Sequence, residues 1–311
     1  MPSTSALPVG YSLRTGDPAE IDAIRELVNS CERQLLGRAE SNRESMAAVF
    51  ARPGFDPALD TVLVQDGTGT LVAHAWVDRR SEARVHPGHR GRGLGEWLLS
   101  WIEARAMEKD TRELAQVVEN ADKVAGELLT ARGFAPSVTA WQLSIELNDE
   151  PTELPAPTGV EVRPFRSADG PAAHTLIEDA FTWQGRRKSY QEWAVLTVER
   201  GSFAPDASMM AVVDGRSVGV LLAMDDPDSA DGYIEQVAVA EDHRGRGIAG
   251  SLLRYAFAAF HRRGRRGCVL WTHSATGALP LYERAGMVVR RSSTVYKKRL
   301  DVTPRNPSGR V

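Results

Sequence analysis

Cysteine is nearly absent from this sequence. The 311 residues contain two cysteines, Cys31 and Cys268, which stand far apart. Two isolated cysteines exclude a disulfide framework and the closely spaced ligands of a structural zinc site. We therefore expect both thiols to be buried apolar side chains, and we expect no metal in the functional site.

Long apolar runs and an excess of one charge are missing too. No run approaches the roughly 20 apolar residues that span a bilayer, and residues 1–10 lack the basic flank and apolar core of a signal peptide. The net charge is −3, whereas nucleic-acid binding needs a dense excess of Lys and Arg. The sequence thus predicts a cytoplasmic protein with neither a membrane nor a nucleic acid as partner, and it leaves the oligomeric state open.

What the sequence does contain is an internal repeat. Residues 85–95 read VHPGHRGRGLG, and residues 239–249 read VAEDHRGRGIA. Further on, LLTARGF at 128–134 matches LYERAGM at 281–287. Blocks in the same order at nearly constant spacing predict two copies of one structural unit, which agrees with a length that suits about two domains.

The domain boundaries follow from this repeat and from proline content. We expect an N-terminal domain over residues 1–149 and a C-terminal domain over residues 159–303. A linker over 150–158, rich in Pro and polar residues, joins them, and a tail over 304–311 follows. Each copy has the pattern of strand, amphipathic helix, hairpin, strand, glycine loop, helix, strand, helix and strand, which predicts an α/β fold with a mixed sheet.

A glycine-rich loop lies between a strand and a helix in both copies. In the second copy the mainly apolar stretch 233–239 precedes the loop, and apolar residues on one helical face follow it. Glycines let the backbone turn tightly and approach a ligand closely, while free N–H groups at a helix N-terminus suit a diphosphate. The structural alternative is a tight strand–helix turn that binds nothing. A nicotinamide-binding loop fits less well, because it would follow the first strand.

The motif Arg-x-x-Gly-x-Gly or Ala, after a strand that ends in valine, resembles the acetyl-CoA signature of the GNAT superfamily acetyltransferases. The resemblance covers about the whole chain as two units, and the tandem arrangement is similar to the mycothiol synthase group. It implies two tandem GNAT-like domains, each with a mixed, mostly antiparallel central sheet flanked by helices. It also implies acetyl-CoA as acyl donor, with the strand backbone binding the pantetheine arm and the loop amides binding the pyrophosphate.

Matching positions occur in both copies. In the second copy the resemblance assigns cofactor binding to Val237, Ala238, Val239, Arg244, Gly245, Arg246, Gly247, Ile248, Ala249 and Gly250. In the first copy it assigns the same role to Val85, Arg90, Gly91, Arg92, Gly93, Leu94 and Gly95.

Glu235 is the first candidate catalytic residue. A carboxylate in the middle of an apolar strand is costly unless it has a task or a partner. Alternation predicts that Tyr233, Glu235, Val237 and Val239 share one face of the strand. In the GNAT family the positions four and six before the terminal valine often hold the general base, which implies Glu235 or Tyr233. A Glu–Arg pair within the sheet, or a Glu that faces the sheet edge, is the structural alternative.

Tyr282 is the second candidate. The resemblance matches it to the family tyrosine that protonates the coenzyme A sulfur, and a phenol with a pKa near 10 can donate this proton at neutral pH. Packing of the ring on the sheet is the alternative. In the first copy the positions that match Tyr233, Glu235 and Tyr282 hold Arg79, Ser81 and Leu129. We therefore expect chemistry in the second copy only.

Three functions remain open at this point. The leading one is N-acetyl transfer from acetyl-CoA to a primary amine of a small molecule, by direct transfer in a ternary complex. The second is the reaction of the mycothiol synthase group, although the Asp-x-x-Asn expected before the last helix is replaced here by Thr272-His273-Ser274-Ala275. The third is a non-catalytic acyl-CoA sensor, which the presence of both Glu235 and Tyr282 disfavours.

Overall fold

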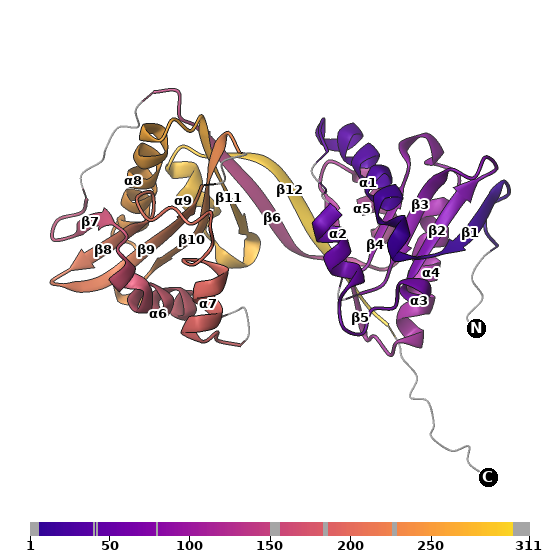
Figure 1. Ribbon diagram of the computed structural model, residues 1–311, viewed down its shortest axis with the longest axis horizontal. Coiled ribbons are helices and arrows are strands. Elements are labelled where there is room, and N and C mark those ends of the chain that lie inside the picture. The colour runs from indigo at the N-terminus through magenta and orange to yellow at the C-terminus, as the bar shows by residue number, and fades with distance from the viewer. Residues whose placement is uncertain are drawn as a thin grey trace, which may run out of the picture. The chain divides into compact units, whose positions relative to one another are not determined.

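The chain is organised in two compact units (Figure 1). This computed structural model describes residues 6–39, 41, 43–78, 80–149, 156–182, 186–225 and 229–300. Unit 1 takes the residues up to Thr139 and those from Ser293 onward, and unit 2 is Ala140–Ser292. Residues 150–155 of the expected linker and the expected tail at 304–311 lie outside the described residues, so the division at 150–158 stays a prediction.

Both units run through the same order of elements. Unit 1 contains β1 (Tyr11–Thr15), α1 (Ile21–Leu36), α2 (Arg43–Phe50), α3 (Pro57–Asp60), β2 (Thr61–Asp66), β3 (Leu71–Trp76), β4 (Glu82–Val85), α4 (Leu94–Glu108), β5 (Glu113–Glu119), α5 (Lys123–Ala131) and the start of β6 (Ala135–Glu146). Unit 2 contains the end of β6, β7 (Glu161–Pro164), α6 (Gly170–Ala180), α7 (Tyr190–Leu196), β8 (Met209–Val213), β9 (Arg216–Met224), β10 (Asp231–Val239), α8 (Ile248–Arg262), β11 (Gly267–His273), α9 (Leu279–Arg284) and the start of β12 (Val288–Arg299).

The sheets are mixed but mostly antiparallel, as expected. One sheet has the strand order β1-β2-β3-β4 with antiparallel neighbours. The other has the order β5-β12-β6-β11-β10-β9-β8-β7, in which β10 and β11 run parallel. An isolated parallel bridge between Ser81 and Gln116 in unit 1 occupies the place of the β10–β11 pairing in unit 2.

The final strand of each half of the sequence pairs within the other unit. In unit 2, residues 140–146 of β6 pair antiparallel with the whole of β11. In unit 1, residues 293–299 of β12 pair antiparallel with the whole of β5. Each sheet is thus closed by a strand from the other copy of the repeat, and unit 2 is inserted between the two parts of unit 1.

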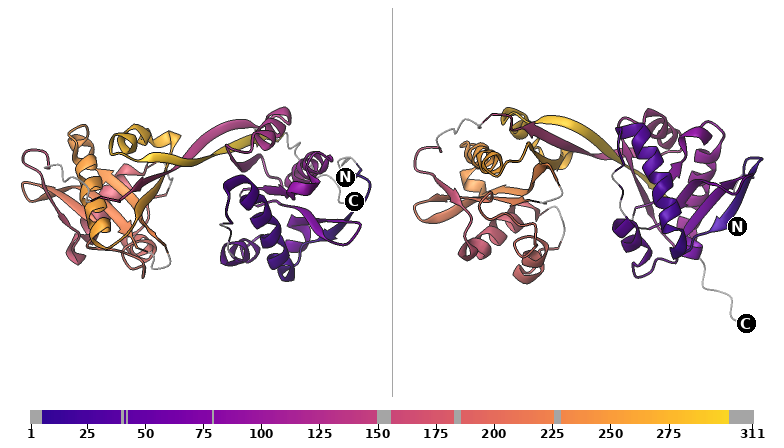
Figure 2. Two further views of the ribbon diagram at one scale, coloured as in Figure 1. Left: turned by 90° about the horizontal axis from the view of Figure 1, so that it is seen from above. Right: turned by 45° about the horizontal axis from the view of Figure 1, so that its top comes forward.

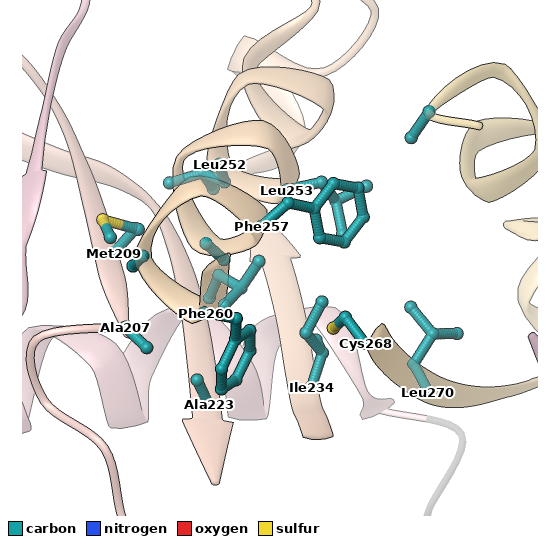
Figure 3. Close-up of a cluster of buried hydrophobic side chains, with 14 of the residues drawn as sticks. Ala207, Met209, Ala223, Ile234, Leu252, Leu253, Phe257, Phe260, Cys268 and Leu270 are labelled. Carbon is teal, nitrogen blue, oxygen red and sulfur yellow. The ribbon is translucent and has the colours of Figure 1, made fainter. Parts of the chain in front are cut away.

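Helices cover both faces of the sheet in unit 2 (Figure 2). The predicted apolar face of α8 is buried against β8, β9, β10 and β11, while α6 and α7 pack on the opposite face. In the close-up, Phe260 of α8 lies beside Ala223 and Ile234 (Figure 3). A Cβ on Gly232 would lie 2.3 Å from the Phe260 ring, so only glycine lets the helix come this close to β10.

Unit 1 is built in the same way. Helix α4 and the side chain of Leu129 in α5 pack with β2 and β3 on one face, and α1 and α2 cover the other. The amphipathic helix that the repeat pattern predicts after the first strand is α1, Ile21–Leu36. Both cysteines are buried and free, as expected from the sequence.

Candidate active site

A gap in strand pairing lies at the centre of unit 2. Strands β10 and β11 pair only over Asp231–Ile234 and Gly267–Leu270. Beyond Ile234, β10 continues to Val239 with β9 on one side and no strand partner on the other among the described residues. Unpaired backbone N–H and C=O groups seek hydrogen-bond partners, and an extended ligand can supply them by lying along the strand edge.

The glycine loop follows directly at the end of this edge. Gly245 and Gly247 have φ values of +74° and +81°, in the left-handed region that favours glycine, and α8 begins at the next residue, Ile248. The Nε of Arg244 donates a hydrogen bond to the carbonyl of Val239 over 3.1 Å. A Cβ on Gly245 or Gly250 would meet nothing within 4 Å, so the loop and the first turn of α8 are open to a ligand there.

Unit 1 has the same loop, but it is anchored differently. Gly91 and Gly93 have φ values of +72° and +80°. The carbonyl of Val85, which matches Val239, accepts a hydrogen bond from the Cys31 thiol with Sγ and O 3.4 Å apart.

Two further contacts distinguish the first loop. The guanidinium of Arg90, which matches Arg244, lies 3.6 Å from the Asp122 carboxylate at the N-terminus of α5. A Cβ on Gly95 would come within 3.0 Å of Leu128, so the first turn of α4 lies close to α5 there. The two loops therefore share their backbone shape and differ in their side-chain contacts.

Glu235 occupies a β-bulge. Ile234 pairs with Ala223 and Gln236 pairs with Leu222, so Glu235 has no position opposite it on β9. The bulge breaks the expected alternation, because Val237 and Val239 pack with the core beneath α8 instead of sharing a face with Glu235. The expectation that these four side chains lie on one face is therefore wrong for the two valines.

The Glu235 side chain lies on the side of α7. Its Oε2 is 3.6 Å from Nη1 of Arg200, in the turn after α7, and its side chain is 29% exposed. Burial, followed by the charge of Glu235, raises the pKa of Tyr233 to about 12. Tyr233 is therefore a neutral phenol beside the carboxylate at neutral pH, which favours Glu235 over Tyr233 as the base.

Tyr282 is placed by the short helix α9. Its side chain is 8% exposed, and it belongs to the same core cluster as Ile234 and Leu270, the residues at which β10 and β11 separate. Burial raises the pKa of this phenol to about 12. No hydrogen bond from its hydroxyl to another described residue is present, so the proton is free for a ligand.

Neither chemical group has a counterpart in unit 1. The Ser81 hydroxyl donates to the carbonyl of Ala115 over 3.1 Å, and Leu129 is buried in the core. Arg79 lies outside the described residues. Sequence reasoning missed Arg200 beside Glu235, and nothing in its neighbourhood along the chain could have indicated that contact.

The described residues also bear on metals and membranes. They contain no group of three or more His, Cys, Asp or Glu side chains arranged to hold a metal ion. None of their helices combines the length and the apolar character that a membrane crossing requires.

Comparisons with known proteins agree with this geometry. Residues 21–134 and 171–287 each match the model of the acetyltransferase (GNAT) family. A mycothiol acetyltransferase of Saccharopolyspora erythraea is 26% identical, with 73% of this chain and 82% of that protein covered. A mycothiol acetyltransferase of Cellulomonas flavigena is 29% identical, with 75% and 72% covered.

Solved structures show the same architecture. A GCN5-related N-acetyltransferase from Sphaerobacter thermophilus superposes with a TM-score of 0.77 at 28% identity, covering 94% of this chain and 97% of that one. A tandem GNAT protein from the clavulanic acid biosynthesis pathway gives a TM-score of 0.67 at 15% identity, covering 95% and 100%. The latter likeness concerns the fold alone.

Proposed function

Because this chain belongs to the acetyltransferase (GNAT) family, we propose that unit 2 transfers an acetyl group from acetyl-CoA to a primary amine of a small molecule. The observation that carries the proposal is the unpaired edge of β10, which runs from the Glu235 bulge to the open glycine loop. An edge of free backbone groups that ends at a helix N-terminus suits a ligand with an extended arm and a diphosphate.

The backbone of Val237, Ala238 and Val239 is proposed to bind the pantetheine arm. The amides from Arg244 to Gly250 bind the pyrophosphate, since the positive end of α8 and the left-handed glycines expose N–H groups there. When bound, acetyl-CoA supplies the acetyl group as a thioester. The matching residues of unit 1, Val85 and Arg90 to Gly95, are proposed to bind a second molecule.

Two side chains of unit 2 move the protons. Glu235, directly or through a water, removes the proton from the acceptor's ammonium group, since a carboxylate can act as a general base. Its residue lies in the bulge, where it has no partner on β9. Tyr282 donates its phenol proton to the departing sulfur, as its raised pKa keeps it protonated throughout the neutral range. The nitrogen–carbon bond forms as the carbon–sulfur bond breaks, within one ternary complex, and the second proton of the nitrogen returns to the Tyr282 phenolate, directly or through water.

The test is acetyl-CoA turnover with a panel of primary amines, followed by thiol release. Each proton-transfer step contributes about 10²–10⁴-fold, so Glu235→Gln and Tyr282→Phe should each lower kcat by about that factor with acetyl-CoA affinity nearly unchanged. Turnover should rise with pH as the amine loses its proton, and Glu235→Gln should suffer most at low pH. Ser81→Ala and Leu129→Met in unit 1 are the matched controls.

The opposite pattern would reassign the active unit. If both unit 2 variants kept full turnover while one of the controls lost it, the chemistry would lie in unit 1. Tight acetyl-CoA binding with no thiol release for any acceptor would favour a non-catalytic acyl-CoA sensor instead.

The names of the relatives support a second candidate. Two proteins that cover most of this chain are called mycothiol acetyltransferases, so their reaction is the next one to assay. The same chemistry at Glu235 and Tyr282 serves either acceptor, and only the acceptor panel separates the two candidates, because a fold and a cofactor site do not fix the substrate.

A further inference from the structure

The bulge of β10 is held by one segment, α7 and the turn that follows it. Gln236 accepts a hydrogen bond from Nε1 of Trp193, over 3.4 Å, and Trp193 is 1% exposed. Its neighbour Glu235 is paired with Arg200. Both residues at the bulge therefore take a side-chain partner from the same segment.

We propose that Arg200 is the positioning residue of Glu235: its guanidinium holds the carboxylate in the direction of the acceptor. The inference rests on the proposed role of Glu235 as general base. A bulge residue lacks the opposite strand position that normally fixes its direction, and the ion pair supplies the missing constraint. Positioning of this kind matters because proton transfer requires the base within hydrogen-bond reach of the proton.

Arg200 is itself held in place through its backbone. Its N–H donates to the carbonyl of Thr197 over 3.1 Å, and its carbonyl accepts from the N–H of Phe203 over 2.9 Å. The Thr197 hydroxyl in turn donates to the carbonyl of Trp193 over 2.7 Å. Backbone hydrogen bonds thus hold the turn on both sides of Arg200, and one of them reaches the buried Thr197, so the Cα of Arg200 is fixed in place.

The electrostatics around Glu235 are simple. Among the described residues, the charged and titratable groups that interact with it are Arg200, from the turn after α7, and Tyr233, from β10 itself. The pKa of Tyr233 is raised to about 12, so its phenol is uncharged at neutral pH and the Arg200 guanidinium is the one charged group of that set. The ion pair with Arg200 is therefore the one charge–charge contact that can fix the direction of the Glu235 carboxylate.

The experiment compares Arg200→Gln and Arg200→Lys with a matched control. Arg290→Gln breaks a similar pair, between Arg290 of β12 and Asp231 of β10. These two residues lie 3.4 Å apart and are 42% and 29% exposed, against 46% and 29% for Arg200 and Glu235. For Arg200→Gln we expect kcat at pH 7 to fall about three- to tenfold with the KM for acetyl-CoA unchanged. Arg200→Lys should restore most of the lost kcat, because it keeps a cation beside the carboxylate.

A double-mutant cycle completes the test. In a Glu235→Gln background, Arg200→Gln should cause no further loss of kcat, because its effect passes through the carboxylate. The inference is overturned if Arg200→Gln keeps full kcat, if Arg290→Gln lowers kcat equally, or if Arg200→Gln costs the same in both backgrounds. Full activity of Glu235→Gln alone would instead overturn the proposed function, and this inference with it.

Discussion

His74 of unit 1 matches the apolar residue Val220 of unit 2. His74 lies on β3 opposite Arg84, and Val220 lies on β9 opposite Ala238, the residue that matches Arg84 in the repeat. Its side chain is fully buried, and neither ring nitrogen has a hydrogen-bond partner among the described residues. Burial, followed by the charge of Arg84, lowers the pKa of His74 to about 3.

This lowered pKa predicts that unit 1 is sensitive to acid. The unfolded chain binds the proton near pH 6.5 while the folded chain resists it, so stability is lost as pH falls from about 6.5 towards 3. At pH 5 the loss amounts to about 2 kcal/mol relative to pH 7. His74→Leu should remove this part of the pH dependence, measured as the denaturation midpoint at pH 5 and pH 7.

A partly exposed histidine of unit 2 provides the control for that measurement. His261→Gln should leave the acid sensitivity as it is in the wild type. An unchanged slope of stability against pH in His74→Leu would contradict the assignment.

Single residues also show where sequence reasoning stops. Glu235 and Tyr282 could be named because they stand at positions to which the resemblance to the GNAT family assigns these roles. The direction of the Glu235 side chain could not, because alternation assumes a regular strand and a bulge inserts one unpaired residue. The contact of Arg200 with Glu235 could not be predicted either, because it joins segments that are distant in sequence.

At the scale of elements, the two glycine loops offer a direct comparison. Their left-handed glycines agree closely, whereas their side-chain contacts differ: Cys31 and Asp122 contact the first loop, and Arg244 contacts the carbonyl of Val239 at the second. Gly247→Glu should abolish acetyl-CoA binding to unit 2, because it puts a side chain and a negative charge where phosphate approaches and strains a backbone with φ of +81°. Calorimetry should report one site fewer than in the wild type.

The matched variant in unit 1 is Gly93→Glu, at a φ of +80°. It should remove the other site and leave turnover in unit 2 intact. Undiminished stoichiometry in Gly247→Glu would show that the second loop is not the phosphate site.

The order of elements was largely predictable, and their partners were not. Helix α1 and the apolar face of α8 follow from periodicity, which is a local property of the sequence. The exchange of β6 and β12 between units is not encoded locally, because either final strand has the alternation needed to pair with β5 or with β11. Strand partners are decided by the packing of the complete molecule.

For the molecule as a whole, the exchange predicts that the halves depend on each other. Expressed alone, fragment 1–149 lacks β12 and fragment 150–311 lacks β6, so β5 or β11 keeps an open edge that promotes aggregation. Expressed together, the fragments should co-purify as one complex in size-exclusion chromatography. Two stable, separate monomers would mean that each half closes its sheet with its own last strand.

Unit 2 enters and leaves unit 1 at residues 139–140 and 292–293, and this has a mechanical consequence. When the chain is pulled from its two ends, the tension runs through unit 1, because β1 and β12 both belong there. Unit 2 bears no load while β12 stays bonded to β5. In an optical-tweezers experiment the two units should therefore unfold in a fixed order, unit 1 first and unit 2 second. This order should hold whichever unit is the more stable in the absence of force.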